Sequence, residues 1–233
     1  MLFCRDVSYT VLMRTVIVMP AYNEGKRVGD TVRSIFALGQ DIHIVVIDDG
    51  STDDTMLAAQ EAGATVIRHT VNRGQGAALQ TGTEWALAHG ADYIVHFDAD
   101  GQFDAADIVR AVSRFSESAP DVILGSRMLA SGNAVPITKK YFLFPIARIV
   151  NWAFTGLWLT DVHNGFRVLS RRAAERIIIE EDGMAHNTEI INHIRRAGLT
   201  FSEMPVTVRY HRYGQGLRGG FKIVGDLLLS WFV

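Results

Sequence analysis

Two carboxylates one residue apart follow an apolar, strand-like stretch near the middle of the chain. The stretch 93–97 leads directly into Asp98, and Asp100 comes two positions later, before a glycine and a carboxamide. Residues i and i+2 of a strand point to the same side, so the two carboxylates can converge. Such oxygen ligands suit Mg²⁺ or Mn²⁺. Because Mg²⁺ usually completes its shell with water and substrate phosphates, a diphosphate is the natural complement. The competing interpretation is an acidic turn that caps a helix beginning near Asp104.

Two other strand-like stretches also end in polar side chains. The stretch 14–19 precedes Asn23 and Glu24, and the stretch 42–47 runs into Asp48. Further strands are predicted at 65–68 and 121–124. Helices are predicted at 28–38, 72–89, 104–115 and 185–197, and one more helix is predicted to begin at Ser51 or Thr52. This alternation predicts a parallel sheet covered by helices on both faces. Ligands bind at the carboxyl ends of strands in such sheets, so three polar strand ends indicate a ligand cleft.

Size and composition favour one large α/β domain or two small ones. The chain has 233 residues, of which 48% are hydrophobic and 21% charged, as in globular proteins. Cys4 is the single cysteine, so no internal disulfide can form and a reducing compartment is expected. The stretch 1–13 carries Arg5 and Asp6 and lacks a continuous hydrophobic segment, so no signal peptide is predicted.

Charge is divided unevenly between the two parts of the chain. Residues 1–126 carry 9 Lys and Arg against 17 Asp and Glu, whereas residues 127–233 carry 14 against 8. This asymmetry predicts a surface in the second part that meets anionic lipid or another polyanion. No nucleic-acid partner is expected, because the basic residues follow no DNA- or RNA-binding motif.

Two apolar stretches suit a membrane surface. The stretch 141–159 contains a proline and Arg148, and a central arginine costs about 2.5–3.5 kcal/mol on insertion. An interfacial helix with Trp152 and Trp158 is therefore expected instead of a spanning one. The stretch 221–233 is an apolar helix with a narrow polar stripe, expected to lie on lipid, on a membrane partner subunit or on a second copy of the chain. Basic residues near it could meet lipid phosphates: Arg209, Arg212, Arg218 and Lys222.

Six motifs occur in a fixed order along the chain. They are P-A-Y-N-E (20–24), V-V-I-D-D-G-S-T-D-D-T (45–55), N-R-G-Q-G-A-A (72–78), F-D-A-D-G-Q (97–102), G-S-R (125–127) and D-V-H-N-G-F-R-V-L-S-R (161–171). In this order they resemble the family 2 glycosyltransferases, in particular the dolichol-phosphate mannose synthases and the bacterial polyprenyl-phosphate glycosyltransferases. The resemblance covers about residues 15–210.

This resemblance implies a GT-A-like, Rossmann-like α/β domain with a mostly parallel sheet. The domain would occupy residues 1–210, with an acceptor-side and interfacial helix at about 137–160, and a basic, then apolar amphipathic tail would follow at 211–233. The implied reaction is the inverting, Mg²⁺- or Mn²⁺-dependent transfer of a hexose, mannose or glucose, from a GDP- or UDP-sugar to a polyprenyl phosphate. The expected location is cytoplasmic, peripheral at the cytoplasmic face of the membrane.

The same resemblance implies roles for individual residues. The residues that would bind the nucleotide sugar are Pro20, Tyr22, Asn23, Glu24, Asp48 and Asp98. The metal would be bound by Asp98, Asp100 and Gln102, and the acceptor phosphate by Arg127 and Arg167. The catalytic residues would be Asp100, Arg127 and Asp161. Arg127 could equally bind the donor diphosphate. Asp161 is either a general base or holds an arginine in place. Glu189 is either an acid near the sugar or a solvated residue of its helix.

The glycine-rich stretch 72–78 departs from the family pattern. A lysine commonly stands at the position of Gln75, and without that cation Gln75 itself is not expected to hold phosphate. The start of the following helix could still offer backbone N–H groups to an anion.

Three rival functions stay open. A transferase acting on a saccharide or protein hydroxyl would need a general base and no basic, apolar second half. A non-catalytic sugar-nucleotide-binding subunit would not need Asp98, Asp100 and Gln102, all of which are intact here. A sugar-nucleotide pyrophosphorylase would show a glycine-rich, basic loop after its first strand, where this chain has P-A-Y-N-E-G.

Overall fold

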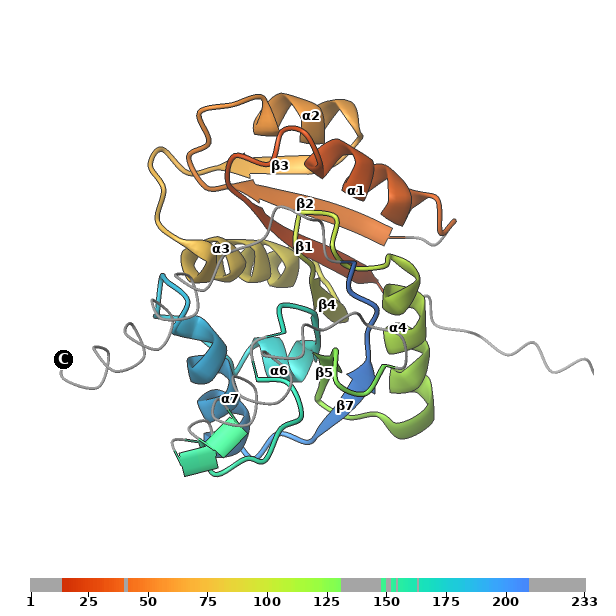
Figure 1. Cartoon of the computed structure of the whole chain (residues 1–233), viewed down its shortest axis with the longest axis vertical. Helices are drawn as coiled ribbons and strands as arrows, with labels where there is room; N and C mark the ends of the chain where they lie inside the picture. Colours follow the sequence, from red (N-terminus) through yellow and green to blue (C-terminus); the bar gives the residue numbers. More distant parts are fainter. Residues whose placement is uncertain are drawn as a thin grey trace, which may run out of the picture.

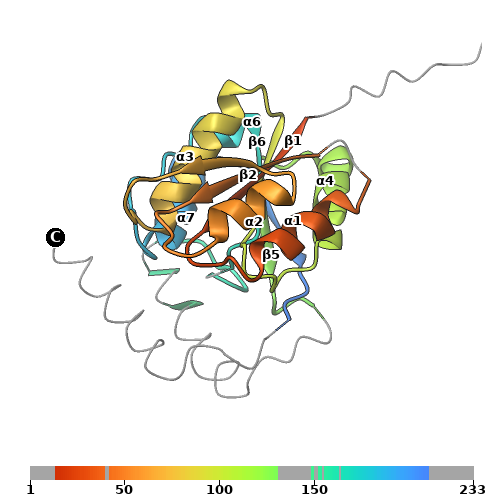
Figure 2. The same cartoon turned by 90° about the horizontal axis from the view of Figure 1, so that it is seen from above.

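A seven-stranded sheet lies at the centre of the protein, and helices cover both of its faces (Figure 1, Figure 2). The computed structural model describes residues 14–39, 42–130, 148–149, 152–153, 155–162 and 164–209. The strands are β1 Thr15–Ala21, β2 Ile42–Asp48, β3 Thr65–Arg68, β4 Tyr93–His96, β5 Val122–Ser126, β6 Arg167–Ser170 and β7 Phe201–Pro205. The helices are α1 Val28–Phe36, α2 Thr55–Glu61, α3 Gln75–Ala88, α4 Ala106–Ser118, α6 Arg171–Ala174 and α7 His186–Arg196.

The sheet is mostly parallel, as predicted, with one exception at its centre. The strand order is β3-β2-β1-β4-β6-β5-β7, and β6 runs antiparallel to both β4 and β5. Neither β6 nor β7 is predicted from the sequence. Both lie after residue 126, beyond the alternation of strands and helices that marks even the four-residue β3. The position of β6 brings the motif 161–171 beside β4 and its carboxylates.

Each face of the sheet packs against helices through its own apolar cluster. Ile17 and Met19 of β1 pack with residues of α1, α2 and α4. Val16 and Val18 pack with residues of α3, α6 and α7 on the other face. The alternation along one buried strand follows from the two-residue period of side-chain direction. It also explains why the central strands are apolar throughout.

The carboxyl ends of the predicted strands meet at one edge, because β1 lies between β2 and β4. β1 was expected to stop before Pro20, but it continues to Ala21, which pairs with Asp48. The carbonyl of Val18 accepts from the N–H of Phe97, directly after β4, at 3.0 Å. The N–H and C=O groups of successive residues alternate sides along a strand, so Pro20 faces the same side as Val18. Pairing with β4 ends at Val18, so the missing N–H of Pro20 leaves no bond unmade.

One predicted helix start is wrong. α2 begins at Thr55 behind Asp54, which makes no side-chain capping bond, and not behind Ser51 or Thr52. Those two residues instead bind the loop after β1, as described below.

The membrane-facing segments are only partly described. Within the ranges given above, no helix has the length and apolar character needed to cross a bilayer. Most of the predicted interfacial helix, and the whole tail 211–233, fall outside the described residues.

Candidate active site

Asp48, at the end of β2, is buried and keeps one acceptor atom unsatisfied. Its Oδ1 accepts from the backbone N–H of Ser51 at 2.9 Å. Its Oδ2 has no hydrogen-bond partner, and Arg68 Nε at the end of β3 lies 3.4 Å from it. A buried acceptor without a donor costs free energy, so a ligand N–H at this point would be stabilised. This agrees with the predicted contact between Asp48 and a nucleobase.

The loop after β1 is held against the loop after β2. Asn23 N donates to Ser51 Oγ, and Asn23 Oδ1 accepts from Thr52 N, both at 2.9 Å. Asn23 has a φ of 55°, a left-handed conformation that asparagine adopts more readily than most residues. Tyr22 is 48% exposed at this edge, so its ring is accessible to a planar base.

Asp98 and Asp100 lie just beyond the end of β4, as predicted. Asp98 Oδ1 accepts from Gln75 Nε2 of α3 at 3.0 Å. Its Oδ2 lies against Gly165, where a Cβ would stand 2.5 Å from it, so only glycine fits there. Asp100 Oδ1 accepts from the backbone N–H of Gln102 at 2.9 Å. The side chain of Gln102 as a metal ligand stays a prediction.

The two carboxylates repel each other. Burial, followed by the negative charge of Asp100, raises the pKa of Asp98 from 3.8 to about 7, against the opposing effects of Arg167, Arg127 and Gln75. A cation between them would remove this electrostatic cost. The described ranges hold no cluster of three or more His, Cys, Asp and Glu arranged for a metal. This donor set fits Mg²⁺ or Mn²⁺, which are bound in such sites by one or two carboxylates plus substrate phosphates.

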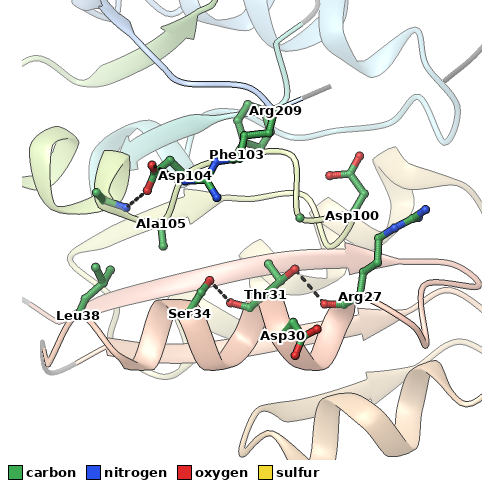
Figure 3. A pocket seen from close by; sticks show the side chains of 12 residues that line it. Arg27, Asp30, Thr31, Ser34, Leu38, Asp100, Phe103, Asp104, Ala105 and Arg209 are labelled. Carbon is green, nitrogen blue, oxygen red and sulfur yellow. Dashed lines mark hydrogen bonds and ion pairs between the residues drawn. The ribbon is translucent and has the colours of Figure 1, made fainter. Parts of the chain in front are cut away.

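A pocket of about 500 Å³ borders Asp100 on the α1 side of the sheet. Figure 3 shows Asp100 and Arg27 at one end of it, and Asp104 with Arg209 towards the other. Arg27 also pairs with Glu24 at 3.0 Å, which connects the predicted nucleotide loop to this pocket. The lining carries two arginines, Arg27 and Arg209, and three aspartates, Asp30, Asp100 and Asp104.

Arg127, which directly follows β5, forms a two-point ion pair with Asp161. Arg127 Nε and Nη2 donate to Oδ2 and Oδ1 of Asp161, both at 2.7 Å, and the backbone N–H of Arg127 donates at 3.0 Å. Burial alone would raise the pKa of Asp161, but the bonds and charge of Arg127, with a bond from Asn164, hold it below 3.8. A carboxylate whose two oxygens both accept from an arginine, and whose pKa is lowered, is a poor proton acceptor. Of the two roles expected for Asp161, this geometry favours holding an arginine.

Arg167 lies beneath the cleft and not at its surface. It is 1% exposed at the start of β6, beside His96 of β4. Its Nη2 donates to Asn187 Oδ1 of α7, and its Nη1 has no hydrogen-bond partner. Burial lowers the pKa of Arg167 to about 10, although Asp98 and Asp161 act against that. This burial argues against the predicted direct contact with the acceptor phosphate; Arg167 instead balances the charge of Asp98.

The N–H groups of the glycine-rich stretch bind partners within the protein, and not a ligand anion as expected. The N–H groups of Arg73 and Gly74 donate to the buried carboxylate of Asp49 at 2.9 and 2.7 Å. The N–H of Gly76 donates to the carbonyl of Asp182 at 2.8 Å. Three donors at the helix start are therefore used within the protein. The expectation is wrong for these three groups.

Three residues of the site are missed by the sequence reasoning. Arg68 ends β3 next to Asp48, so the rule about strand ends could have found it. Gln75 stands where the family commonly has a lysine, but the sequence does not predict its hydrogen bond to Asp98. Nothing in the sequence signals Asn187, because its partner Arg167 is 20 positions away.

Comparison with known proteins identifies the class. The family model described as glycosyl transferase family 2 matches residues 16–178. The chain belongs to this family and is a hexosyltransferase. The resemblance seen in the six motifs is confirmed.

Three relatives align over almost their whole length. An uncharacterised protein of Methanocaldococcus jannaschii is 34% identical, over 92% of this chain and 90% of its own. The UDP-N-acetylglucosamine–dolichyl-phosphate N-acetylglucosaminyltransferase of Methanococcus voltae is 27% identical, over 91% and 94%. The undecaprenyl-phosphate mannosyltransferase of Micrococcus luteus is 27% identical, over 94% and 92%.

Solved structures share the fold. Glucosyl-3-phosphoglycerate synthase of Mycobacterium tuberculosis, in complex with Mn²⁺, UDP and glucosyl-3-phosphoglycerate, superposes with a TM-score of 0.69 at 20% identity. The match covers 93% of this chain and 79% of that one. The predicted GT-A-like α/β fold is thus confirmed for the described part of the chain.

Proposed function

We propose that this enzyme transfers a hexose from a nucleotide diphosphate sugar to a polyprenyl phosphate, with Mg²⁺ or Mn²⁺ held at Asp98 and Asp100. On the donor side, the unsatisfied Oδ2 of Asp48 would accept from the N–H of a guanine or uracil base. Tyr22, Asn23 and Glu24 would contact the nucleoside. The metal, when bound, would act as a Lewis acid on the leaving diphosphate.

The acceptor assignment depends on one observation, the ion pair between Arg127 and Asp161. A hydroxyl acceptor needs a base to remove its proton, and the carboxylate best placed for this is occupied on both oxygens by an arginine. A phosphate monoester brings its own negative charge at neutral pH, since its second pKa is about 6. It needs a positioned cation instead of a base, and Asp161 orients Arg127 for that role. The names of two relatives, which include dolichyl and undecaprenyl phosphate, support the same acceptor class.

The test is a transfer assay with matched acceptors. The purified chain is incubated with labelled GDP- and UDP-sugars and Mn²⁺, together with a polyprenyl phosphate, the same polyprenol without its phosphate, or 3-phosphoglycerate. We expect organic-extractable label with the polyprenyl phosphate alone. Label on 3-phosphoglycerate, or equal label on the free polyprenol, would show that the acceptor class is wrong.

An exposed aromatic surface supports a location at the membrane. Ile149, Trp152 and Trp158 are each more than half exposed, and the two indoles meet edge to face at 6.5 Å. Arg148 stands over the Trp158 ring at 4.9 Å. Tryptophans beside a cation are typical of surfaces that enter the headgroup layer of a bilayer. We infer peripheral binding at the cytoplasmic face, where a polyprenyl phosphate would present its headgroup.

Binding to anionic vesicles checks this inference. We expect the chain to sediment with anionic vesicles at low salt, and less so as salt rises, because exposed charges are screened beyond about 10 Å at 0.1 M. Replacing both Trp152 and Trp158 by alanine, or deleting residues 221–233, should weaken sedimentation but not nucleotide binding. Leu57→Ala, at another exposed apolar residue, is the control and should change nothing. A wild-type chain that stays in the supernatant at low salt would contradict the membrane assignment.

A further inference from the structure

Glu189, on the first turn of α7, is not a freely solvated residue of its helix. Its side chain is only 14% exposed. Its Oε1 accepts from the backbone N–H of Glu180 at 3.0 Å, and its Oε2 from that of Glu181 at 3.1 Å. Both carboxylate oxygens therefore hold one backbone segment, which we call the 180–182 segment. Carboxylate bonds to backbone N–H groups are among the stronger hydrogen bonds in proteins.

The 180–182 segment packs directly on the start of α3. The carbonyl of Asp182 accepts from the N–H of Gly76 at 2.8 Å. A Cβ at Gly74 would overlap the Asp182 carbonyl oxygen, and one at Gly76 would overlap that of Glu181. Gly74 also has a φ of 110°, which favours glycine. The position of the segment therefore fixes the position of the helix start.

The residue between these two glycines reaches the metal site. Gln75 Nε2 donates to Asp98 Oδ1 at 3.0 Å. A second connection from the same turn of α7 runs through Asn187, which accepts from the buried Arg167 beneath Asp98. One turn of helix is thus linked to Asp98 by two routes, a hydrogen bond from Gln75 and the positive charge of Arg167.

We propose that Glu189 is a positioning residue for the metal and diphosphate site, acting on Asp98 through the 180–182 segment, the start of α3 and Gln75. This inference rests on the proposed function for the identity of the site, but its geometry can be tested without turnover. Residues that orient metal ligands commonly contribute 10–100-fold to metal affinity when removed. We therefore expect Glu189 to affect binding of the metal as well as the rate.

The experiment uses the full chain with Glu189→Ala, Gln75→Ala and the double variant. Hydrogen exchange should become faster at the amides of 74–76 in Glu189→Ala and stay unchanged in the peptides of β1 and α1. Binding of Mn²⁺ alone, followed by loss of the free-ion EPR signal, should weaken about 10-fold in each single variant. The double variant should be little weaker than either single one, because the two residues act in series.

Controls separate positioning from a general loss of structure and from catalysis. Glu189→Gln keeps one acceptor oxygen, so its exchange and its Mn²⁺ affinity should lie between those of wild type and Glu189→Ala. Glu175→Ala, at an exposed glutamate that directly follows α6 and pairs with Arg171, should match wild type. Three outcomes would each overturn the proposal. The first is an unchanged rate of hydrogen exchange at the amides of 74–76, and the second is a double variant whose loss of Mn²⁺ affinity is the product of the two single losses. The third is an unchanged Mn²⁺ affinity together with the loss of one limb of the pH–rate profile, which would indicate a direct acid–base role for Glu189. None of the binding results depends on which acceptor the enzyme uses.

Discussion

Replacing Asp100 by asparagine is expected to lower turnover by about 10²–10³-fold, the range seen when one preorganised charge-stabilising group is removed from a site. The amide keeps the shape of the side chain and its bond to the Gln102 N–H. It removes the charge that offsets the cation. It also removes the second negative charge that raises the pKa of Asp98. Metal dependence should therefore shift to much higher Mn²⁺ concentrations while the fold persists.

The measurement is initial rate against Mn²⁺ concentration for wild type and Asp100→Asn, with thermal melting of both. Asp92→Asn is a matched control, because Asp92 precedes the same strand at its opposite end, where it accepts from the N–H of Arg14 at 2.9 Å. That variant should retain wild-type metal dependence. Full activity of Asp100→Asn, or wild-type activity undiminished by EDTA, would refute the metal assignment.

Replacing Arg127 by alanine is expected to reduce use of the polyprenyl phosphate by about 10²–10³-fold, again the size of a lost charge-stabilising group. Asp161→Asn should cost less, about 10-fold, because an amide can still accept from the guanidinium and orient it. The decisive result is that Arg127→Ala loses more activity than Asp161→Asn. It follows from treating Arg127 as the group that meets phosphate and Asp161 as its support.

Stability must be measured beside activity for this pair. Arg127→Ala leaves the buried Asp161 without its cation, and breaking a buried pair in this way costs about 3–5 kcal/mol. The pKa of Asp161 is below 3.8 in the folded chain. The ion pair therefore contributes its full stability at pH values above the pKa of Asp161 in the unfolded chain. This contribution is lost as the pH falls through the lower pKa of Asp161 in the folded chain. Assays between pH 6 and 9 avoid that transition.

The pH dependence separates a phosphate acceptor from a hydroxyl acceptor. Asp161→Asn should lose the same fraction of rate across pH 6–9, since no proton is transferred to Asp161. Arg172→Ala is the control for removing an arginine, because Arg172 pairs with Asp121 at 3.3 Å near the start of β5. A large Asp161→Asn loss that follows one titrating group, with a mild Arg127→Ala effect, would favour a hydroxyl acceptor.

The amino-acid sequence was enough to predict the alternation of strands and helices and the chemistry at the strand ends. These features are local: an apolar stretch of four to six residues predicts a buried strand, and the residues after it must emerge at the sheet edge. Asp48, Asp98 and Asp100 were therefore located correctly at one edge before any tertiary information. The six ordered motifs likewise sufficed to place the chain in its glycosyltransferase family.

The contacts that those residues make depend on how the strands and helices pack together. The insertion of β6 between β4 and β5 buries Arg167 beneath Asp98, and no local pattern marks a four-residue strand for that place. The pairing of Arg127 with Asp161 spans 34 positions, and the contact of Gly76 with Asp182 spans more than 100. Such contacts are selected by the packing of whole elements, which side-chain periodicity does not encode. For this reason the sequence left two possible roles open for Asp161 and for Glu189. In the folded chain, the carboxylate of Asp161 holds Arg127, and that of Glu189 holds the backbone of the 180–182 segment.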